Sequence, residues 1–518
     1  MELKKQSIHM NYEKGRAVSQ ITLDDDFNLP DYKPDIVRIM KTKGEIHFEE
    51  VRVSEGHLQV KGTLDFVILY RSDQSDRKID SLCGSISFTE NLMMDGVTEL
   101  DPVHMTADME DLTIGIINSR KLNIRALVML TGHAGETRAE EIITDVWDED
   151  ALEIKKENRN VLQLIECKRD NFRFREELQI PSSKPNIRDI LWKSVQLRGV
   201  ESRLRNNSIE LTGEILVYLL YLGEEDSEHL QWIEMTVPLT GSVPCGNCAE
   251  DLIYRIQSTP RTIELEVRPD YDGEQRMLSL DMVLDLFICL WQEENVEMVK
   301  DLYSLKQQLV PQYEEGILPQ FVTKNYAKCK ITDQIQLEKE QENILQICAC
   351  EGRVSVDNQT VEEDGVRVEG TLEVELMYIT TDDTMPIGTL KGLLAFSQLV
   401  EAPGVQPQCE IGLEAGIEQL SAMLIDNTQV EIKASLNLNL IVFSNQRMQK
   451  LSDVTVGEDS MESLQKQPGI VGYIVKPDDT LWSIAKNNHT TIAELIHTNQ
   501  LESQEVQGGE KLLIVKSV

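Results

Sequence analysis

The sequence predicts a mainly β protein: three tandem β-rich repeat domains, sandwich-like or barrel-like, followed by a small α+β domain with the order strand, helix, helix, strand. Two observations support the repeats. The chain resembles itself at offsets of 151 and 157 residues. Inside each copy apolar and polar residues alternate, which is the pattern of strands with one buried and one exposed face. A change of periodicity near the C-terminus predicts the small domain.

The first two repeats share a ten-residue motif. Residues 30–39 and 181–190 both fit P-x-x-K-P-[DN]-I-x-x-I, 151 residues apart. Apolar residues three apart after a proline predict a short helical turn. We expect Lys33 and Lys184 to be solvated beside the rigid Pro34 and Pro185. Contact of these lysines with a partner is the less favoured interpretation.

Strands follow the motif in each copy. Residues 62–70 match 213–221 at the same offset of 151, and 370–378 follow 157 residues later, although the Lys-Pro pair does not recur in the third copy. In that copy Leu372, Val374 and Leu376 alternate with Glu373 and Glu375. Each copy closes with an alternating strand, at 121–129, 277–284 and 429–436.

These segments predict the domain boundaries. The repeat domains span 1–134, 135–292 and 293–445, and the second and third each begin with a polar joining segment, 135–170 and 293–327. The joining segments retain some apolar residues, so each can add an element to a neighbouring repeat. Residues 446–467 have no periodicity and predict a flexible linker to the C-terminal domain, 468–518.

The composition excludes several classes of partner. The 518 residues carry 51 basic and 89 acidic side chains, a net charge of −38, with no basic patch. Such a chain repels nucleic acid and anionic membranes. We find no signal peptide and no apolar stretch of the roughly 20 residues that span a bilayer, so we expect no direct membrane insertion. Nine cysteines do not indicate a disulfide framework, and we expect a reducing cytoplasm.

Catalytic or metal chemistry has little support. Cys245 and Cys248 form a C-x-x-C pair, which suits half of a zinc site or a redox pair, but a plain turn is the favoured interpretation. The eight histidines form no hydrolase or zinc motif. We therefore predict no enzyme activity and no cofactor.

Each element of the C-terminal domain can be predicted from local sequence signals. Residues 473–476 predict a strand and 477–479 a turn. Thr480 can cap a helix that carries Leu481 and Ile484 inward, and a second helix starts at Thr491 with Glu494 at the capping-box spacing. Residues 512–515 predict the closing strand. Trp482 lies about 100° from the inward face, which favours either an exposed binding anchor or a cap over the small core.

This domain resembles a LysM module. The matching residues are Tyr473, Val475, Thr480–Ala485, Leu495, Asn499, Leu501 and Leu512, and Asp478 stands where the family has glycine. LysM modules bind N-acetylglucosamine glycans in a groove between two loops, which the resemblance places at 477–480 and 498–501. With the exposed helix face, the resemblance implies a binding site of nine residues: Ile470, Pro477, Asp478, Asp479, Thr480, Trp482, Thr498, Asn499 and Leu501.

The three repeats resemble SPOCS domains, and SPOCS repeats followed by LysM are similar to a family of spore coat morphogenetic proteins. The resemblance implies a non-enzymatic scaffold in the mother-cell cytoplasm and at the forespore surface. Its partners would be a coat morphogenetic ATPase, bound mainly through the LysM domain, and other coat proteins. Three alternatives stay open: a peptidoglycan-binding protein at the spore cortex, a cell-wall hydrolase, and a self-assembling structural protein.

Overall fold

The structure is a computed structural model that describes residues 1–74, 77–148, 152–224, 230–339, 341–382, 384–457 and 469–515. Strands dominate it, as the alternation predicts, and they form three groups of six in one repeated order. We name these groups modules 1, 2 and 3.

Module 1 contains β1 (Glu2–Asn28), β2 (Ile36–Ser54), β3 (His57–Ser72), β4 (Ile79–Met93), β5 (Val103–Asn118) and β6 (Lys121–Trp147). Module 2 contains β7 (Leu152–Gln179), β8 (Ile187–Arg205), β9 (Ser208–Gly223), β10 (Leu230–Pro244), β11 (Ile253–Pro269) and β12 (Gln275–Ser304). Module 3 contains β13 (Leu309–Gln336), β14 (Ile344–Glu362), β15 (Gly365–Thr380), β16 (Ile387–Glu401), β17 (Glu410–Leu424) and β18 (Gln429–Val456).

Each module is a sandwich of two three-stranded antiparallel sheets, which confirms the predicted fold class. In module 1 the sheets have the orders β1-β6-β5 and β2-β3-β4, and the other modules repeat both orders. The core lies between the sheets, where Leu58 and Val60 of β3 meet Leu122 and Ile124 of β6, all with no exposed surface. The predicted closing strands therefore belong to β6, β12 and β18, each the central strand of the sheet that contains the first strand of its module.

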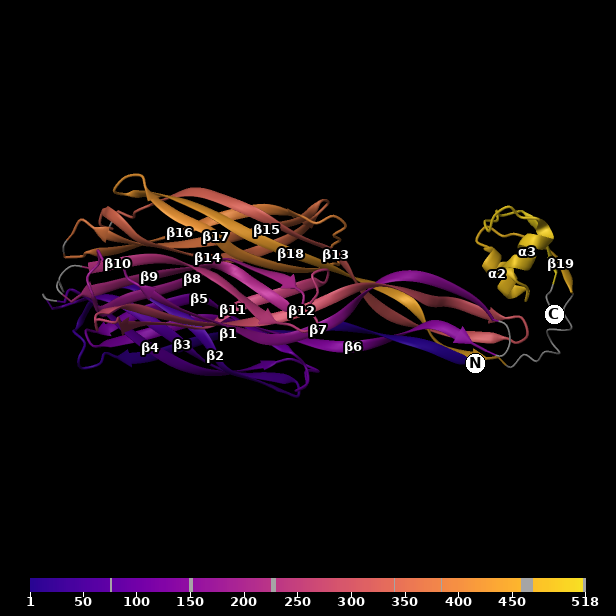
Figure 1. Ribbon diagram of the computed structural model, residues 1–518, viewed down its shortest axis with the longest axis horizontal. Coiled ribbons are helices and arrows are strands. Elements are labelled where there is room, and N and C mark those ends of the chain that lie inside the picture. The colour runs from indigo at the N-terminus through magenta and orange to yellow at the C-terminus, as the bar shows by residue number, and fades with distance from the viewer. Residues whose placement is uncertain are drawn as a thin grey trace.

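The first and last strands of each module extend beyond its sandwich. In module 1, residues 2–13 pair only with 135–147, as a two-stranded ribbon. The ribbons of the three modules pack side by side into a stalk that projects from the body formed by the sandwiches (Figure 1). Side chains from all three ribbons fill its centre, among them Val146, Leu302 and Val454.

The predicted domain boundaries differ from this arrangement. The positions 134/135, 292/293 and 445/446 each fall inside a continuous strand: β6, β12 and β18. The joining segments are the stalk ribbons and the strands that lead into them. Their charged residues are exposed or half-buried, while buried apolar residues such as Val161 and Leu302 face the other ribbons. Of the predicted linker 446–467, residues 446–456 belong to β18, and 458–467 lie outside the described residues.

The three sandwiches also pack against one another. A shared cluster joins Leu69 of module 1, Trp192 of module 2 and Met377 of module 3. Lys41 of β2 lies in this contact with 3% of its surface exposed, and its ammonium pairs with Glu375 of β15 at 2.6 Å. The body is therefore one packed unit and not a string of independent domains.

The helical turn predicted at the repeated motif is wrong. Residues 31–33 form a turn in which Lys33 N donates to Pro30 O (3.0 Å), and β2 begins at Ile36. The carbonyl of Pro34 accepts a hydrogen bond from the buried Tyr70 (3.2 Å), and Arg120 donates to the carbonyl of Pro30 (3.0 Å). Module 2 repeats this scheme, so the motif marks the entry into a strand.

The expected solvation of the motif lysines is also wrong. Lys33 pairs with Asp80 at 2.8 Å, and the side chain of Asp80 has no exposed surface. Lys184 lies over the ring of Trp232, 5.0 Å from its centroid. Both ammonium groups thus fold back onto the opposite edge strand of the sheet that the motif enters, β4 in module 1 and β10 in module 2. A further difference is a disulfide between Cys167 and Cys289, which face each other across β7 and β12.

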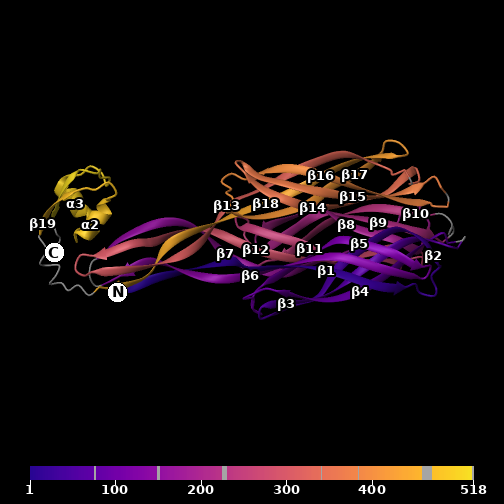
Figure 2. The ribbon, with the colours of Figure 1, turned by 180° about the vertical axis from the view of Figure 1, so that it is seen from behind.

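The C-terminal domain confirms the predicted order of strand, helix, helix and strand. It contains β19 (Ile470–Ile474), α2 (Leu481–Asn487), α3 (Ile492–Asn499) and β20 (Lys511–Val515). The domain lies at the far end of the stalk, near the N-terminus of the chain, as both views show (Figure 1, Figure 2). Within the described residues no helix is long and apolar enough to cross a membrane.

Candidate binding site in the C-terminal domain

The first loop of the predicted groove, 477–480, is braced by its own strand. Asp479 accepts hydrogen bonds from the Tyr473 hydroxyl (2.6 Å) and from Lys476 N (2.9 Å). These bonds hold the pKa of Asp479 below its usual range. Thr480 and Ser483 form a capping box, which confirms Thr480 as the N-cap of α2. Asp479 and Thr480 therefore shape the loop, and Asp479 Oδ2 and Thr480 Oγ1 are already engaged.

The second loop, 498–501, is braced in the same way. Asn499 donates to the carbonyl of Leu513 (2.8 Å) and accepts from its N–H (2.7 Å), which ties the end of α3 to β20. Leu501 is half-buried and packs on the small core, and Thr498 is half-buried as well. Gln500 between them has a left-handed backbone and ends α3.

Four of the nine predicted contact residues are exposed, and one of them, Thr480, has its side chain engaged in the capping box of α2. Pro477 and Asp478 are exposed at the tip of the first loop, and Ile470 of β19 has 65% of its surface exposed. The available face of the domain thus combines apolar surface with one free carboxylate. Such a face suits a protein partner with a neutral or basic surface.

Trp482 is half-buried and packs against the cluster that joins the small core to Tyr303 of the stalk, so it is not the exposed anchor and instead caps the small core together with the stalk. Its indole N–H donates to Asp301 on the stalk end of β12 (2.8 Å). The ring lies edge-to-face against Tyr303 of the same strand, with centroids 5.0 Å apart. Lys155 of β7 lies over the ring at 5.9 Å. The indole was correctly placed off the inward face of α2, but the stalk covers it.

Further contacts complete this docking surface. Lys486 of α2 pairs with Asp301 at 2.6 Å, and the Tyr303 hydroxyl donates to the carbonyl of Thr490 (2.9 Å). Burial disfavours the ionised form of Asp301, but the hydrogen bonds from Lys486 and Trp482 outweigh it, so the pKa of Asp301 lies below its usual range. Burial also raises the pKa of Tyr303 well above its usual value.

Sequence reasoning missed Asp301 and Tyr303. Both lie in the segment that we interpreted as a polar join, and nothing local distinguishes them from its other charged and aromatic residues. The only available signal was Trp482 itself, an indole off the core face that required a cover. Its cover comes from a strand about 180 residues earlier in the chain.

Cys245 and Cys248 lie in a turn, as predicted, and both are buried in the core of module 2. At the matching turn module 1 has Met94 and Val97, and module 3 has the buried Ala402 and Val405. The cysteines thus fill apolar positions of the repeat. Within the described ranges no group of three or more metal-ligating side chains comes together.

Comparison with protein families identifies two kinds of domain. The family described as "SipL, SPOCS domain" matches residues 35–117 and 343–425, which are β2–β5 of module 1 and β14–β17 of module 3. The LysM domain family matches 473–515. Module 2, which lies between the two matched stretches, has the topology of its neighbours. No curated protein and no solved structure matches the chain significantly.

Proposed function

The chain combines SPOCS domains with a C-terminal LysM domain, the architecture of a SipL-type protein, and from this premise we propose that it is a non-enzymatic scaffold of spore coat assembly. Both matched families are binding-type domains, and neither indicates an enzyme. In this proposal the LysM domain binds a coat morphogenetic ATPase at the forespore surface, on the side of the mother-cell cytoplasm. The body recruits other coat proteins.

One observation carries the proposal: the LysM domain is mounted at the tip of a stalk. The paired ribbons 2–13 and 135–147 extend on the order of 40 Å beyond the sandwiches, at about 3.3 Å per residue. The docking contacts of Trp482 and Lys486 use one side of α2. The loop at Pro477 and Asp478 stays exposed. This arrangement presents a binding face to an assembled surface while the body is held away from it.

The binding test uses the full chain and the purified coat ATPase in biolayer interferometry. Ile470→Glu and Asp478→Lys change two exposed positions of the predicted LysM site outside the core of the domain. We expect each to weaken binding at least tenfold, about 1.4 kcal/mol. The matched control is Tyr271→Glu, a fully exposed aromatic in the turn between β11 and β12. Wild-type affinity in both LysM variants would contradict the proposed binding face.

A second candidate is a peptidoglycan-binding function, favoured by the LysM match at 473–515. The groove loops are well ordered by Asp479 and Asn499, whose hydrogen bonds are internal, so a glycan would contact the exposed backbone and Pro477. Saturable binding of chitin oligomers to the full chain, lost in a variant that ends at Gly457, would favour this function over the scaffold.

Localisation separates the two candidates. A fluorescent fusion should form a ring around the forespore when the coat begins to assemble, and this ring should require the coat ATPase. A ring that persists without the ATPase, or diffuse fluorescence, would count against the scaffold proposal.

A further inference from the structure

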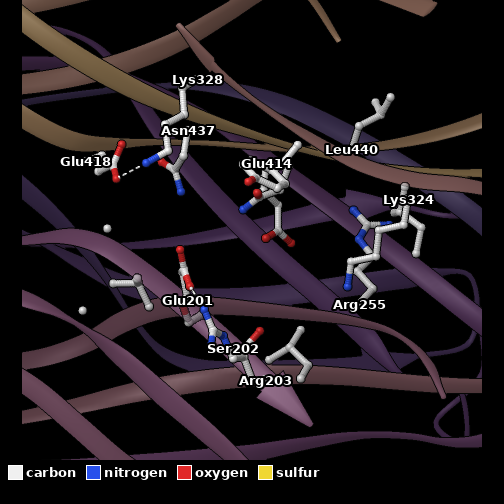
Figure 3. Close-up of a pocket in the computed structure, with 18 of the residues that line it drawn as sticks. Glu201, Ser202, Arg203, Arg255, Lys324, Lys328, Glu414, Glu418, Asn437 and Leu440 are labelled. Atoms are coloured by element: carbon white, nitrogen blue, oxygen red, sulfur yellow. Dashed lines mark hydrogen bonds and ion pairs between the residues drawn. The ribbon is translucent and has the colours of Figure 1, made fainter. Parts of the chain in front are cut away.

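A polar cavity of about 820 Å³ lies between modules 2 and 3, far from the LysM domain. Strands β8 and β11 line it from one side, and β13, β17 and β18 from the other. Figure 3 shows Arg255 and Lys324 at one end of the cavity and Glu414 near its middle. Its volume is in the range of sites that hold small ligands.

A bulge in β8 shapes one wall. Arg198 pairs with Glu214 and Glu201 with Thr212, so Gly199 and the residue after it have no partner in the ladder. Gly199 has a positive φ of 55°, a conformation that favours glycine. The bulge bends the edge of this sheet beside the edge strand β17 of module 3, and the cavity lies at that point.

The equivalent contact between modules 1 and 2 is closed by aromatic rings. There His104 of β5 stacks on Phe287 of β12, with centroids 5.5 Å apart. By the register of the repeats, the positions of His104 and Phe287 are occupied at the contact of modules 2 and 3 by Arg255 and Asn439. The fold can therefore close this contact with two rings, and at the second contact it has a cation and an amide instead.

The cavity contains polar groups without partners. Within the described residues the Arg255 guanidinium makes no hydrogen bond or ion pair, whereas Lys328 and Glu418 pair with each other. One carboxylate oxygen of Glu414 and the amide oxygen of Asn437 are buried with no hydrogen-bond donor. Buried groups in this state each cost on the order of 1–3 kcal/mol, which a ligand with matching groups would recover.

The electrostatics of the cavity favour an anion. Burial lowers the pKa of Lys324 to about 8, although the nearby Glu414 acts in the opposite direction. Burial likewise raises the pKa of Glu414 against the effect of Arg255 and Lys324. Both cations act on Glu414, and Arg255 also acts on Glu410, whose pKa burial likewise raises. The lining as a whole has five basic side chains and four carboxylates, in a protein whose net charge is −38. An added anion would stabilise both cations in their charged form.

We propose that this cavity is a binding site for an organic anion, whose carboxylate or phosphate binds Arg255 and Lys324 and whose N–H or O–H groups donate to Glu414 and Asn437. A planar carboxylate or a phosphate can accept two parallel hydrogen bonds from the free guanidinium. The same chemistry is available from a free small molecule and from an acidic segment of a protein. The site is independent of the LysM domain and of the scaffold function.

The test is isothermal titration calorimetry on the full chain with three probes: glutamate, glucose 6-phosphate and an N-acetylated peptide of three glutamates. We expect one binding event per chain for at least one probe. The small molecules and the peptide distinguish the two sources. Arg255→Gln should weaken binding more than tenfold. Arg52→Gln, which changes an exposed arginine of β2, is the matched control and should bind as wild type.

A double variant tests the site independently, in case Arg255→Gln loses binding only because the protein unfolds. R255H/N439F places the His–Phe pair of the contact between modules 1 and 2 at the equivalent positions between modules 2 and 3. The two rings should fill the cavity and abolish binding, while the circular dichroism spectrum should stay that of the wild type. No binding of any of the three probes to the wild type would overturn the proposal. Equal binding by the wild type and the folded double variant would overturn it as well.

Discussion

Lys33 and Lys184 occupy the same position of the repeated motif but have different partners. Lys33 is bound to Asp80, a carboxylate with no exposed surface, which also receives a hydrogen bond from Arg77 (2.9 Å). Among the described residues the contacts of Lys184 are with neutral groups, the Trp232 ring and an amide oxygen 3.5 Å away. The motif therefore conserves a position for an ammonium group while its partner varies between modules.

This difference predicts unequal costs of substitution. Lys33→Ala leaves Asp80 with one cation in a buried site and should cost about 2 kcal/mol of local stability. Lys184→Ala is the matched control and should cost roughly 0.5–1 kcal/mol, the size of a cation–π contact. Hydrogen exchange of peptides from β4 and β10 measures both. Equal loss of protection in the two variants would contradict the importance of the buried pair.

Asp301 makes the docking of the LysM domain depend on pH. Because its pKa is lowered in the docked state, docking is fully supported above the ordinary aspartate pKa and is lost as the pH falls through the lowered value. Spin labels at the exposed positions Val310 and Leu513 should give a narrow distance distribution at neutral pH and a broad one in acid.

Asp301→Asn provides the control for general acid unfolding. It removes the ion pair with Lys486 and should broaden the same distribution already at pH 7, since a partly exposed charge-assisted contact contributes about 1–2 kcal/mol. A narrow distribution in this variant would show that Tyr303 and the indole hold the domain without the charge.

At the scale of elements, period-two alternation predicted the strands of the sandwiches because each has one face in a local core. For this reason the alternation of residues 121–129 correctly predicts a strand, part of β6. The stalk ribbons could not be predicted in the same way. Ile8, Val161 and Leu318 share one cluster in the stalk, but they lie more than 150 residues apart in the chain. Only the assembled modules bring such sparse apolar residues together.

Shortening a buried side chain in the core of the stalk should destabilise the stalk and not the body. Leu302 of β12 has no exposed surface and contacts the other ribbons, so Leu302→Ala should cost about 2–4 kcal/mol through lost burial and a cavity. Limited proteolysis should then cut the stalk and leave the body intact. Val310→Ala on the exposed side of β13 should behave as the wild type. Simultaneous cleavage of the body would mean that stalk and body unfold as one unit.

The candidate site was partly predictable for a related reason. Capping residues such as Thr480 act on their immediate neighbours, so sequence spacing identifies them. The cover of Trp482 and the cavity at Arg255 both arise between segments far apart in the chain. Neither leaves a local pattern.

At the scale of the whole molecule, the stalk makes the protein long for its mass. A compact chain of 518 residues would have a radius of gyration of about 24 Å. The 30-residue strand β12 alone extends about 100 Å from the body to the stalk tip. Small-angle X-ray scattering in moderate salt should give a radius well above the compact value and a maximum dimension beyond 100 Å. Values typical of a sphere would contradict the projecting stalk.

The position of β18 has a mechanical consequence. This strand is the middle one of its sheet, between β13 and β17, and its C-terminal end at the stalk tip is the point from which the chain continues to the LysM domain. Tension on a tethered LysM domain would pull β18 along its own axis. Inside the sandwich the ladder hydrogen bonds to β13 and β17, and in the stalk those to β13 alone, would then bear the load together in shear, and would not peel apart one at a time. The molecule is thus arranged to resist traction between the tip of its stalk and its body.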